Sequence, residues 1–292
     1  MPLRIPAGIS VAAVLLALPA APQAAGVVTP SSVTAVRAVP AGDTVNMSLH
    51  CPRTAVALNG VVRQKGAGTT VRRSAPGQDA GDWSFTLAAA PGSKARRASA
   101  VLRCVQLTLP IGTSRARLGV RTRGNPAVVI PAGGSTPVQL RCGAGWIGTG
   151  YGLDAGTSDD VRLAAVVPVA RGWNFNVENT GSAPVTAGVS VRCLKRTVPA
   201  RSGGAPTTLR FRVTRPAGPA SLGPRRTSFA RTCDPGQFSL ATGSIVDALD
   251  SIELDASGPT RRSWGRWSFT HASGGDHVRT FLVCLSTRGS FS

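Results

Sequence analysis

The sequence predicts an all-β protein of three tandem small β-sandwich-like repeats, each with one disulfide inside the repeat. Two observations carry this prediction. Six cysteines recur with a period close to 91 residues, as expected of repeated units. An alternation of apolar and polar residues precedes the second cysteine of each period, as on a half-buried strand. Short strands separated by Gly and Pro turns, with no long helical period, favour sandwiches or small barrels.

The cysteine spacing selects one pairing of the fifteen that six cysteines allow. The two cysteines of a period are 53, 51 and 51 residues apart. We therefore expect one bridge in each repeat and none between repeats. The same period divides the chain into residues 1–25, 26–114, 115–205 and 206–292, the first segment being an export signal. The expected bridges are Cys51–Cys104, Cys142–Cys193 and Cys233–Cys284.

Three kinds of strand are expected in each repeat. The repeat starts are Val33–Val39, Arg117–Arg123 and Leu209–Arg215. A phrase that begins with tryptophan follows, at Trp83–Thr86, Trp173–Asn176 and Trp267–Thr270. The last strand surrounds the second cysteine, at Val101–Val105, Val191–Leu194 and Phe281–Leu285. Turn-forming residues separate the last two strands, so each repeat is predicted to end in a hairpin with a buried tryptophan in equivalent positions.

The N-terminus has the features of a cleaved signal peptide. Arg4 precedes an apolar run over Ile9–Leu18, and Pro19 and small residues up to Ala25 follow it. The run is shorter than the roughly 20 residues of a bilayer span, so a signal peptide is favoured over an anchor. Each repeat has only about 85 residues, where a core alone gives limited stability, so a disulfide in an oxidising compartment is consistent. We expect a secreted protein in the extracellular space, at the cell surface or in the periplasm, without a transmembrane anchor.

The middle repeat resembles a bacterial extracellular repeat module. It reads Gly172–Asn179 followed by Val185–Cys193, similar to Gly-Trp-x-Val-x-Val-x-Asn and Val-x-Ala-x-Cys. The module begins with Cys-Pro-x-Gly and a glycine run. Cys51–Pro52 and Cys233–Gly236 are similar to that start, and the run is kept in part within Gly145–Gly152. The resemblance implies a β module of secreted or cell-surface proteins, and it supplies no catalytic residue.

No pattern for catalysis or a cofactor is found, so we expect a protein that is not an enzyme and holds no cofactor. A triad could use His271 and Asp276, but no Gly-x-Ser-x-Gly elbow accompanies them. The segment Gly145–Gly152 lacks the lysine and the Gly-x-Gly-x-x-Gly pattern of phosphate loops, and close strand packing or a bulge is the better interpretation. A secreted hydrolase is the most distant alternative.

No metal site is expected either. The cysteines lack the paired spacing of zinc sites. The acidic residues Asp247, Asp250, Glu253 and Asp255 do not follow the calcium-loop pattern, so a solvated strand face is the simpler interpretation.

The basic charge is the functional lead. Lys and Arg number 33 against 13 acids, a net charge of +20. Arginines alternate with aliphatic residues at two repeat starts, which predicts an arginine row on the outer face of a strand. Such a row can protect an edge strand from pairing with other molecules, or it can bind anionic polymers. The candidate residues are Arg115, Arg117, Arg121, Arg123, Arg210, Arg212 and Arg215.

Two function classes stay open from the sequence. One is a surface or matrix protein that binds wall polymer, acidic polysaccharide, lipid headgroups or extracellular DNA through arginine-rich faces. The other is a structural spacer or stalk without a polymer ligand. Aromatic residues do not interleave with the arginines, so sequence-specific nucleic-acid binding is not expected.

Overall fold

The computed structural model is all-β, as predicted. It describes residues 27–64, 68–108, 115–116, 118–198, 207–208, 211–214, 220–221, 225–246, 252–259, 264–271 and 277–286. The expected signal peptide lies outside these ranges, as do Asp247, Asp250 and Asp276. The short pairs β7 (Arg115–Ala116), β14 (Thr197–Val198), β15 (Thr207–Thr208) and β17 (Ala220–Ser221) accompany the main strands.

Repeat 1 is a sandwich of two three-stranded antiparallel layers. One layer has the order β1 (Val27–Val39), β6 (Arg96–Thr108) and β3 (Val56–Gln64). The other has the order β2 (Thr44–His50), β5 (Asp82–Ala89) and β4 (Thr69–Pro76). The side chains of β5 alternate between half-buried and buried, with Trp83, Phe85 and Leu87 inside.

Repeats 2 and 3 reproduce this pairing strand for strand. In repeat 2 the layers are β8 (Val120–Ile130), β13 (Val185–Lys195) and β10 (Trp146–Asp154), and β9 (Ser135–Arg141), β12 (Gly172–Asn179) and β11 (Val161–Val169). In repeat 3 they are β16 (Phe211–Thr214), β22 (His277–Ser286) and β19 (Gln237–Val246), and β18 (Arg225–Thr232), β21 (Trp264–His271) and β20 (Ile252–Pro259).

The expected terminal hairpin is wrong. The tryptophan strand β5 pairs with β2 and β4, whereas the cysteine strand β6 pairs with β1 and β3. The two strands therefore lie in opposite layers, and the turn between them crosses the sandwich. Alternation and a Gly or Pro turn reveal two consecutive strands, but they do not distinguish a hairpin within one sheet from a crossing between two packed sheets.

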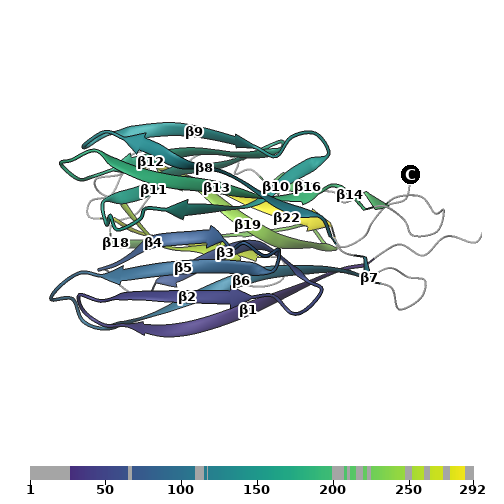
Figure 1. Cartoon of the computed structure of the whole chain (residues 1–292), viewed down its shortest axis with the longest axis horizontal. Helices are drawn as coiled ribbons and strands as arrows, with labels where there is room; N and C mark the ends of the chain where they lie inside the picture. Colours follow the sequence, from purple (N-terminus) through teal and green to yellow (C-terminus); the bar gives the residue numbers. More distant parts are fainter. Residues whose placement is uncertain are drawn as a thin grey trace, which may run out of the picture.

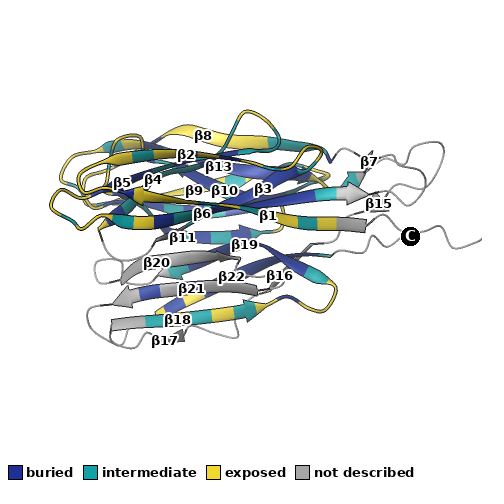
Figure 2. Cartoon of the chain, turned by 90° about the horizontal axis from the view of Figure 1, so that it is seen from below, coloured by how far each residue is buried: buried dark blue, intermediate teal, exposed yellow. Residues whose placement is uncertain are grey.

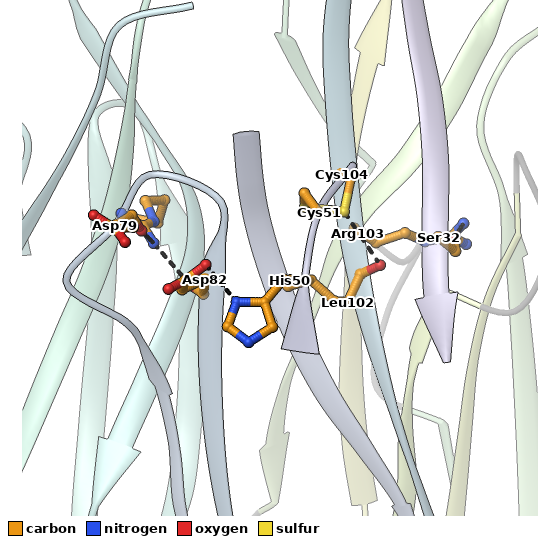
Figure 3. The surroundings of a disulfide bond; sticks show 9 residues. Ser32, His50, Cys51, Asp79, Asp82, Leu102, Arg103 and Cys104 are labelled. Carbon is orange, nitrogen blue, oxygen red and sulfur yellow. Dashed lines mark hydrogen bonds and ion pairs between the residues drawn. A yellow bond between two sulfur atoms is a disulfide. The ribbon is translucent and has the colours of Figure 1, made fainter. Parts of the chain in front are cut away.

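The three disulfides of the structure join the pairs that the spacing predicts. Each bridge connects the two layers of its repeat, because the first cysteine directly follows the edge strand of one layer and the second lies on the central strand of the other. Figure 3 shows this arrangement around Cys51 and Cys104, with Cys51 next to β2 and Cys104 on β6. The bridges thus hold the two faces of each sandwich together.

The repeats share their sheets with one another. β4 of repeat 1 pairs with β10 of repeat 2, β11 pairs with β19 of repeat 3, and β20 pairs with β3 of repeat 1. The outcome is three sheets of six or seven strands, each built from two repeats. Figures 1 and 2 show the repeats side by side, with their strands along the long axis of the molecule. The same contact made three times closes into a ring, as in a cyclic trimer.

Equivalent bulges mark the inner strand of each repeat. The register shifts between Ala57 and Asn59 in β3, and at the corresponding places in β10 and β19. The residues inserted at the bulges are fully buried, and they are Leu58, Thr149 and Leu240. Each stands seven residues after the first cysteine of its repeat. The interpretation of the Gly145–Gly152 segment as a bulge is therefore confirmed.

The main hydrophobic cluster draws residues from all three repeats, and repeats 1 and 3 each have a further cluster around Trp83 and Trp267. The main cluster contains Leu58 of repeat 1, Phe175 of repeat 2 and Phe238 of repeat 3. Trp83, Trp173 and Trp267 are fully buried, as predicted. Trp146 is half-buried, and the side chain of Trp264 lies outside the described residues. Sheet sharing thus places the repeats around a common interior.

Glycine permits the close approach of strands at two equivalent seams. A Cβ atom at Gly152 would lie 2.6 Å from the Ser74 carbonyl oxygen, and one at Gly243 would lie 2.3 Å from that of Val166. Both glycines stand ten residues after the first cysteine of their repeat. In each case the carbonyl belongs to the strand of the neighbouring repeat that pairs at the seam. The equivalent position of the third seam holds Val61, so the close approach requires glycine at two of the three seams.

We expect Trp173→Ala to lower the free energy of unfolding by about 3–5 kcal/mol, because it empties a large volume in the shared core. Guanidinium denaturation of the oxidised protein measures the change. Val129→Ala is the matched control, since Val129 is 64% exposed and should change stability by at most about 0.5 kcal/mol. A loss below about 1 kcal/mol for Trp173→Ala would contradict the burial of this ring.

Gly152→Ala should destabilise the protein by about 1–3 kcal/mol, because the added methyl group overlaps the backbone of repeat 1. Gly188→Ala in the same sheet is the control, since its Cβ would meet no atom closer than 3.5 Å. Thermal unfolding of the two variants compares them directly. Equal melting temperatures would show that the seam accommodates a side chain at Gly152.

Candidate anion-binding end of repeat 2

The structure places the predicted arginines on three strands. Arg115 lies in β7 and Arg212 in β16, but their side chains lie outside the described residues, as do Arg117, Arg210 and Arg215 altogether. Arg121 and Arg123 lie on β8, which is an edge strand of its sheet. Figure 2 shows that much of β8 is exposed. Of the predicted arginine row, the side chains of Arg121 and Arg123 are therefore the ones that the structure describes.

The register of β8 differs from the expected outward row. Arg121 is paired with Cys193 and Arg123 with Val191, and both partners are fully buried. Directly opposite side chains of an antiparallel pair lie on the same face, so these arginines share the face of core residues and reach solvent past the sheet edge. Arg37 on the edge strand β1 is likewise exposed and opposite buried Ala98. Inward-pointing charges of this kind keep edge strands from pairing.

Arg121 is held by two contacts at the disulfide end of repeat 2. Its guanidinium carbon lies 4.2 Å from the centre of the Trp146 ring, a cation–π geometry. Its Nη2 atom donates a hydrogen bond to the Cys142 carbonyl oxygen. The side chain is half-buried as a result. Arg121 therefore braces the turn after Cys142 and keeps its positive charge close to the surface.

Further basic side chains surround the same end. Arg141 ends β9, and the Cys142 amide donates a hydrogen bond to the Arg171 carbonyl oxygen at 2.8 Å. Lys195 is paired with Trp146 at the end of β13. The short strands β7 and β14 lie at this same end of repeat 2, at the right in Figure 1. We call this group the cationic end of repeat 2, and all of its members except Arg121 are exposed: Arg121, Arg123, Arg141, Arg171, Lys195 and Arg196.

The paired carboxylates of repeat 2 lie away from its disulfide end, whereas Asp79 and Asp82 of repeat 1 lie beside Arg192 of β13. Asp154 lies at the opposite end of β10 from Trp146, about 26 Å along the strand at 3.3 Å per residue. It pairs with Arg73, and Asp159 pairs with Arg72, both at 2.5 Å. Glu178 accepts from Arg162 at 2.5 Å near the same far end. Within the described residues, no ion pair engages a member of the cationic end.

The distribution of charge along the sequence indicates the cationic end, which the periodicity within single strands does not reveal. Residues 83–153 contain nine basic residues and no acid, and residues 179–233 contain ten basic residues and no acid. These two segments supply β8, β9 and β13, so these three strands bring no carboxylate of their own to the end. Alternation within a strand predicted Arg121 and Arg123 as candidate binding residues. It could not find Arg141, Arg171, Lys195 or Arg196, which lie at strand ends and turns.

A buried arginine joins repeat 2 to repeat 1 nearby. Arg192 is only 2% exposed, and its Nη2 atom donates to the carbonyl oxygens of Asp82 at 3.1 Å and Asp79 at 3.4 Å. Nη1 donates to Thr122 Oγ1 at 3.2 Å, and the guanidinium lies 5.9 Å from the Trp83 ring. Burial lowers the pKa of Arg192 to about 10, and the Asp82 carboxylate partly opposes this shift.

Among the described residues, no catalytic group of side chains surrounds His50, the histidine that pairs with an acid. His50 Nδ1 lies 2.8 Å from Asp82 Oδ1 on the neighbouring strand (Figure 3). This pair is a cross-strand contact at the surface. Among the residues that the structure describes, no group of three His, Cys, Asp or Glu side chains could hold a metal ion. No helix in the described part of the chain is long and apolar enough to cross a membrane.

Comparisons with known proteins give no family. No protein-family model matches the chain, and no curated protein is significantly similar to it. The three disulfides are compatible with an extracellular location.

Arg192→Ala should lower the free energy of unfolding by about 2–4 kcal/mol, because it leaves a void and removes the donor from two carbonyl groups. Arg192→Met should lose less than half as much, because it fills the volume and removes the desolvation penalty that is present at all pH values below the lowered pKa. Denaturant unfolding at pH 7 measures both. Arg123→Ala is the exposed control and should be neutral. Equal losses for Ala and Met would mean that the hydrogen bonds, rather than the filled volume, hold the repeats together.

Proposed function

We propose that the protein is a secreted or surface-associated, non-catalytic β-repeat protein that binds anionic polymers. The cationic end of repeat 2 is the observation that carries the proposal. Its five exposed side chains lie around one disulfide and one turn. Arginine donates bidentate hydrogen bonds to phosphate, sulfate and carboxylate groups. A polymer with regularly spaced anions gains from several such contacts at once.

Two features support this class over a simple excess of charge. Lys195 ends β13 and Arg196 follows it, so both stand at the rigid end of a central strand. Arg121 is fixed on Trp146, so part of the positive field is ordered before a ligand arrives. By contrast, Arg72, Arg73 and Arg162 are engaged by carboxylates at the far end. The charge of repeat 2 is therefore polarised along its strands.

The spacer alternative has less support. A spacer gains reach when its repeats follow one another end to end. Here the repeats lie side by side and share sheets, so three repeats are little longer than one. Protection of edge strands remains the better explanation of Arg37, and of Arg121 and Arg123 on the core-facing side of β8. It does not account for Arg171, Lys195 and Arg196, which lie in turns or at the end of a strand.

The test is a variant in which the five exposed members of the cationic end are changed to Ser: Arg123, Arg141, Arg171, Lys195 and Arg196. Folding should be nearly unchanged, because exposed charges contribute little to stability. Binding to dextran sulfate and to a short DNA duplex should weaken by about tenfold or more, and the dependence of log Kd on log salt should become less steep. Fluorescence titration at several salt concentrations measures both quantities.

A charge-matched control changes five exposed bases elsewhere to Ser: Arg37, Arg53, Lys94, Arg97 and Arg279. This variant has the same net charge, and it should keep most of the affinity. Equal weakening of the two variants would show that net charge alone attracts the polymer. Unchanged binding in both, or no binding by the parent protein, would overturn the proposal in favour of the spacer.

A further inference from the structure

A groove of about 400 Å³ lies at the seam between repeats 1 and 2. Arg73 of β4 contributes from repeat 1, and β8, β10 and β13 contribute from repeat 2. The volume is within the range of about 300–1,000 Å³ that is typical of small-molecule sites. The groove exists because β4 and β10 belong to one sheet, so a single repeat would not form it.

The lining combines apolar residues with side chains that donate and accept hydrogen bonds. Thr122, Asn125 and Thr186 line the groove and are exposed, so they bring hydroxyl and amide groups to it. The Asn125 side-chain oxygen accepts from the Ala127 amide at 3.3 Å, which leaves its NH₂ group to donate. Ser190 also lines the groove, but its Oγ atom is buried below the surface. Gly124, Gly156 and Gly188 line the rest of the groove and have no side chains that would narrow it.

An ion pair between the two repeats forms the charged part of the groove. Arg73 Nη1 lies 2.5 Å from Asp154 Oδ2, and the two side chains remain 41% and 38% exposed. The net charge of the pair is zero, so the groove differs from the cationic end of repeat 2. Its carboxylate would repel a bound anion, while an uncharged ligand could use both partners. One hydroxyl of a vicinal diol can donate to the carboxylate while the other accepts from the guanidinium.

We propose that the seam groove binds a neutral polyhydroxylated ligand, namely a short stretch of an uncharged oligosaccharide. This site is separate from the anion-binding end and does not depend on it. The Arg73–Asp154 pair positions two adjacent hydroxyls, and Asn125 and Thr186 bind those of the neighbouring sugar unit. The ligand touches both repeats, so its binding stabilises the seam.

An extended peptide fits the groove less well. A peptide that adds to a sheet edge needs a flat run of free backbone groups. The edge strand β8 carries Pro126 and a register shift at this place, and both hinder strand addition. The polar side chains of the lining favour a ligand that is recognised by its hydroxyl groups.

The experiment titrates the full-length mature protein with chitotetraose, cellotetraose and maltotetraose and records amide chemical shifts by NMR. At least one tetrasaccharide should shift the amide signals of Thr122, Thr186 and Gly188, and saturating ligand should raise the melting temperature. The affinity should be the same at low and high salt, because the ligand is uncharged. The double variant Asn125→Ala with Thr186→Val should bind about tenfold more weakly, since it removes two hydrogen-bonding side chains from the groove.

Ser31→Ala with Thr34→Val on β1 is the matched control, because it also removes two hydrogen-bonding side-chain groups, from an exposed strand away from the groove. This control should bind like the parent protein. Equal affinity of the groove variant and the parent protein would overturn the proposed site. So would shifts of the groove amides by dextran sulfate oligomers but by none of the three neutral tetrasaccharides. Neither result would bear on the anion-binding end, which is tested by its own variant.

Discussion

Each three-stranded layer would leave the backbone groups of its inner edge strand unpaired if its repeat stood alone. The fold depends on pairing these inner edges between repeats. Within each repeat the three-stranded layers end at an inner strand, such as β3 or β4. Exposed edges of this kind are templates for aggregation. The chain pairs each inner edge with that of the next repeat, and the third pairing, between β20 and β3, returns to the first repeat. Ring closure thus satisfies all three seams with one kind of contact.

The seams explain where the unusual residues are. Gly152 and Gly243 stand where a neighbouring backbone comes closest. The ion pairs of Arg72 and Arg73 cross from repeat 1 to repeat 2, and Arg192 donates in the reverse direction. The two ion pairs engage Asp154 and Asp159 at one end of repeat 2. The bases at the other end are left for the solvent or for a ligand, so the surface chemistry follows from the way the repeats are joined.

Much of the fold could be predicted from the sequence because it depends on period and alternation. The 91-residue period gives the bridges, and the alternation after Trp173 gives a buried strand face. The sharing of sheets could not be predicted, since each seam pairs only one or two residues on a strand, such as Arg73 with Asp154. The orientation of Arg121 and Arg123 could not be predicted because their exposure comes from the position of β8 at the sheet edge. The cationic end required the spatial meeting of segments that are distant in the chain.

The disulfides staple each repeat internally, and none spans a seam. The ring is therefore closed by non-covalent contacts and by the linkers alone. A single proteolytic cut between repeats leaves every sandwich covalently intact. If the outermost fragment dissociates, however, it uncovers two inner edges on the remaining pair at the same time. The lifetime of the folded protein then depends on the linkers, since their loss would turn a closed assembly into a self-associating one.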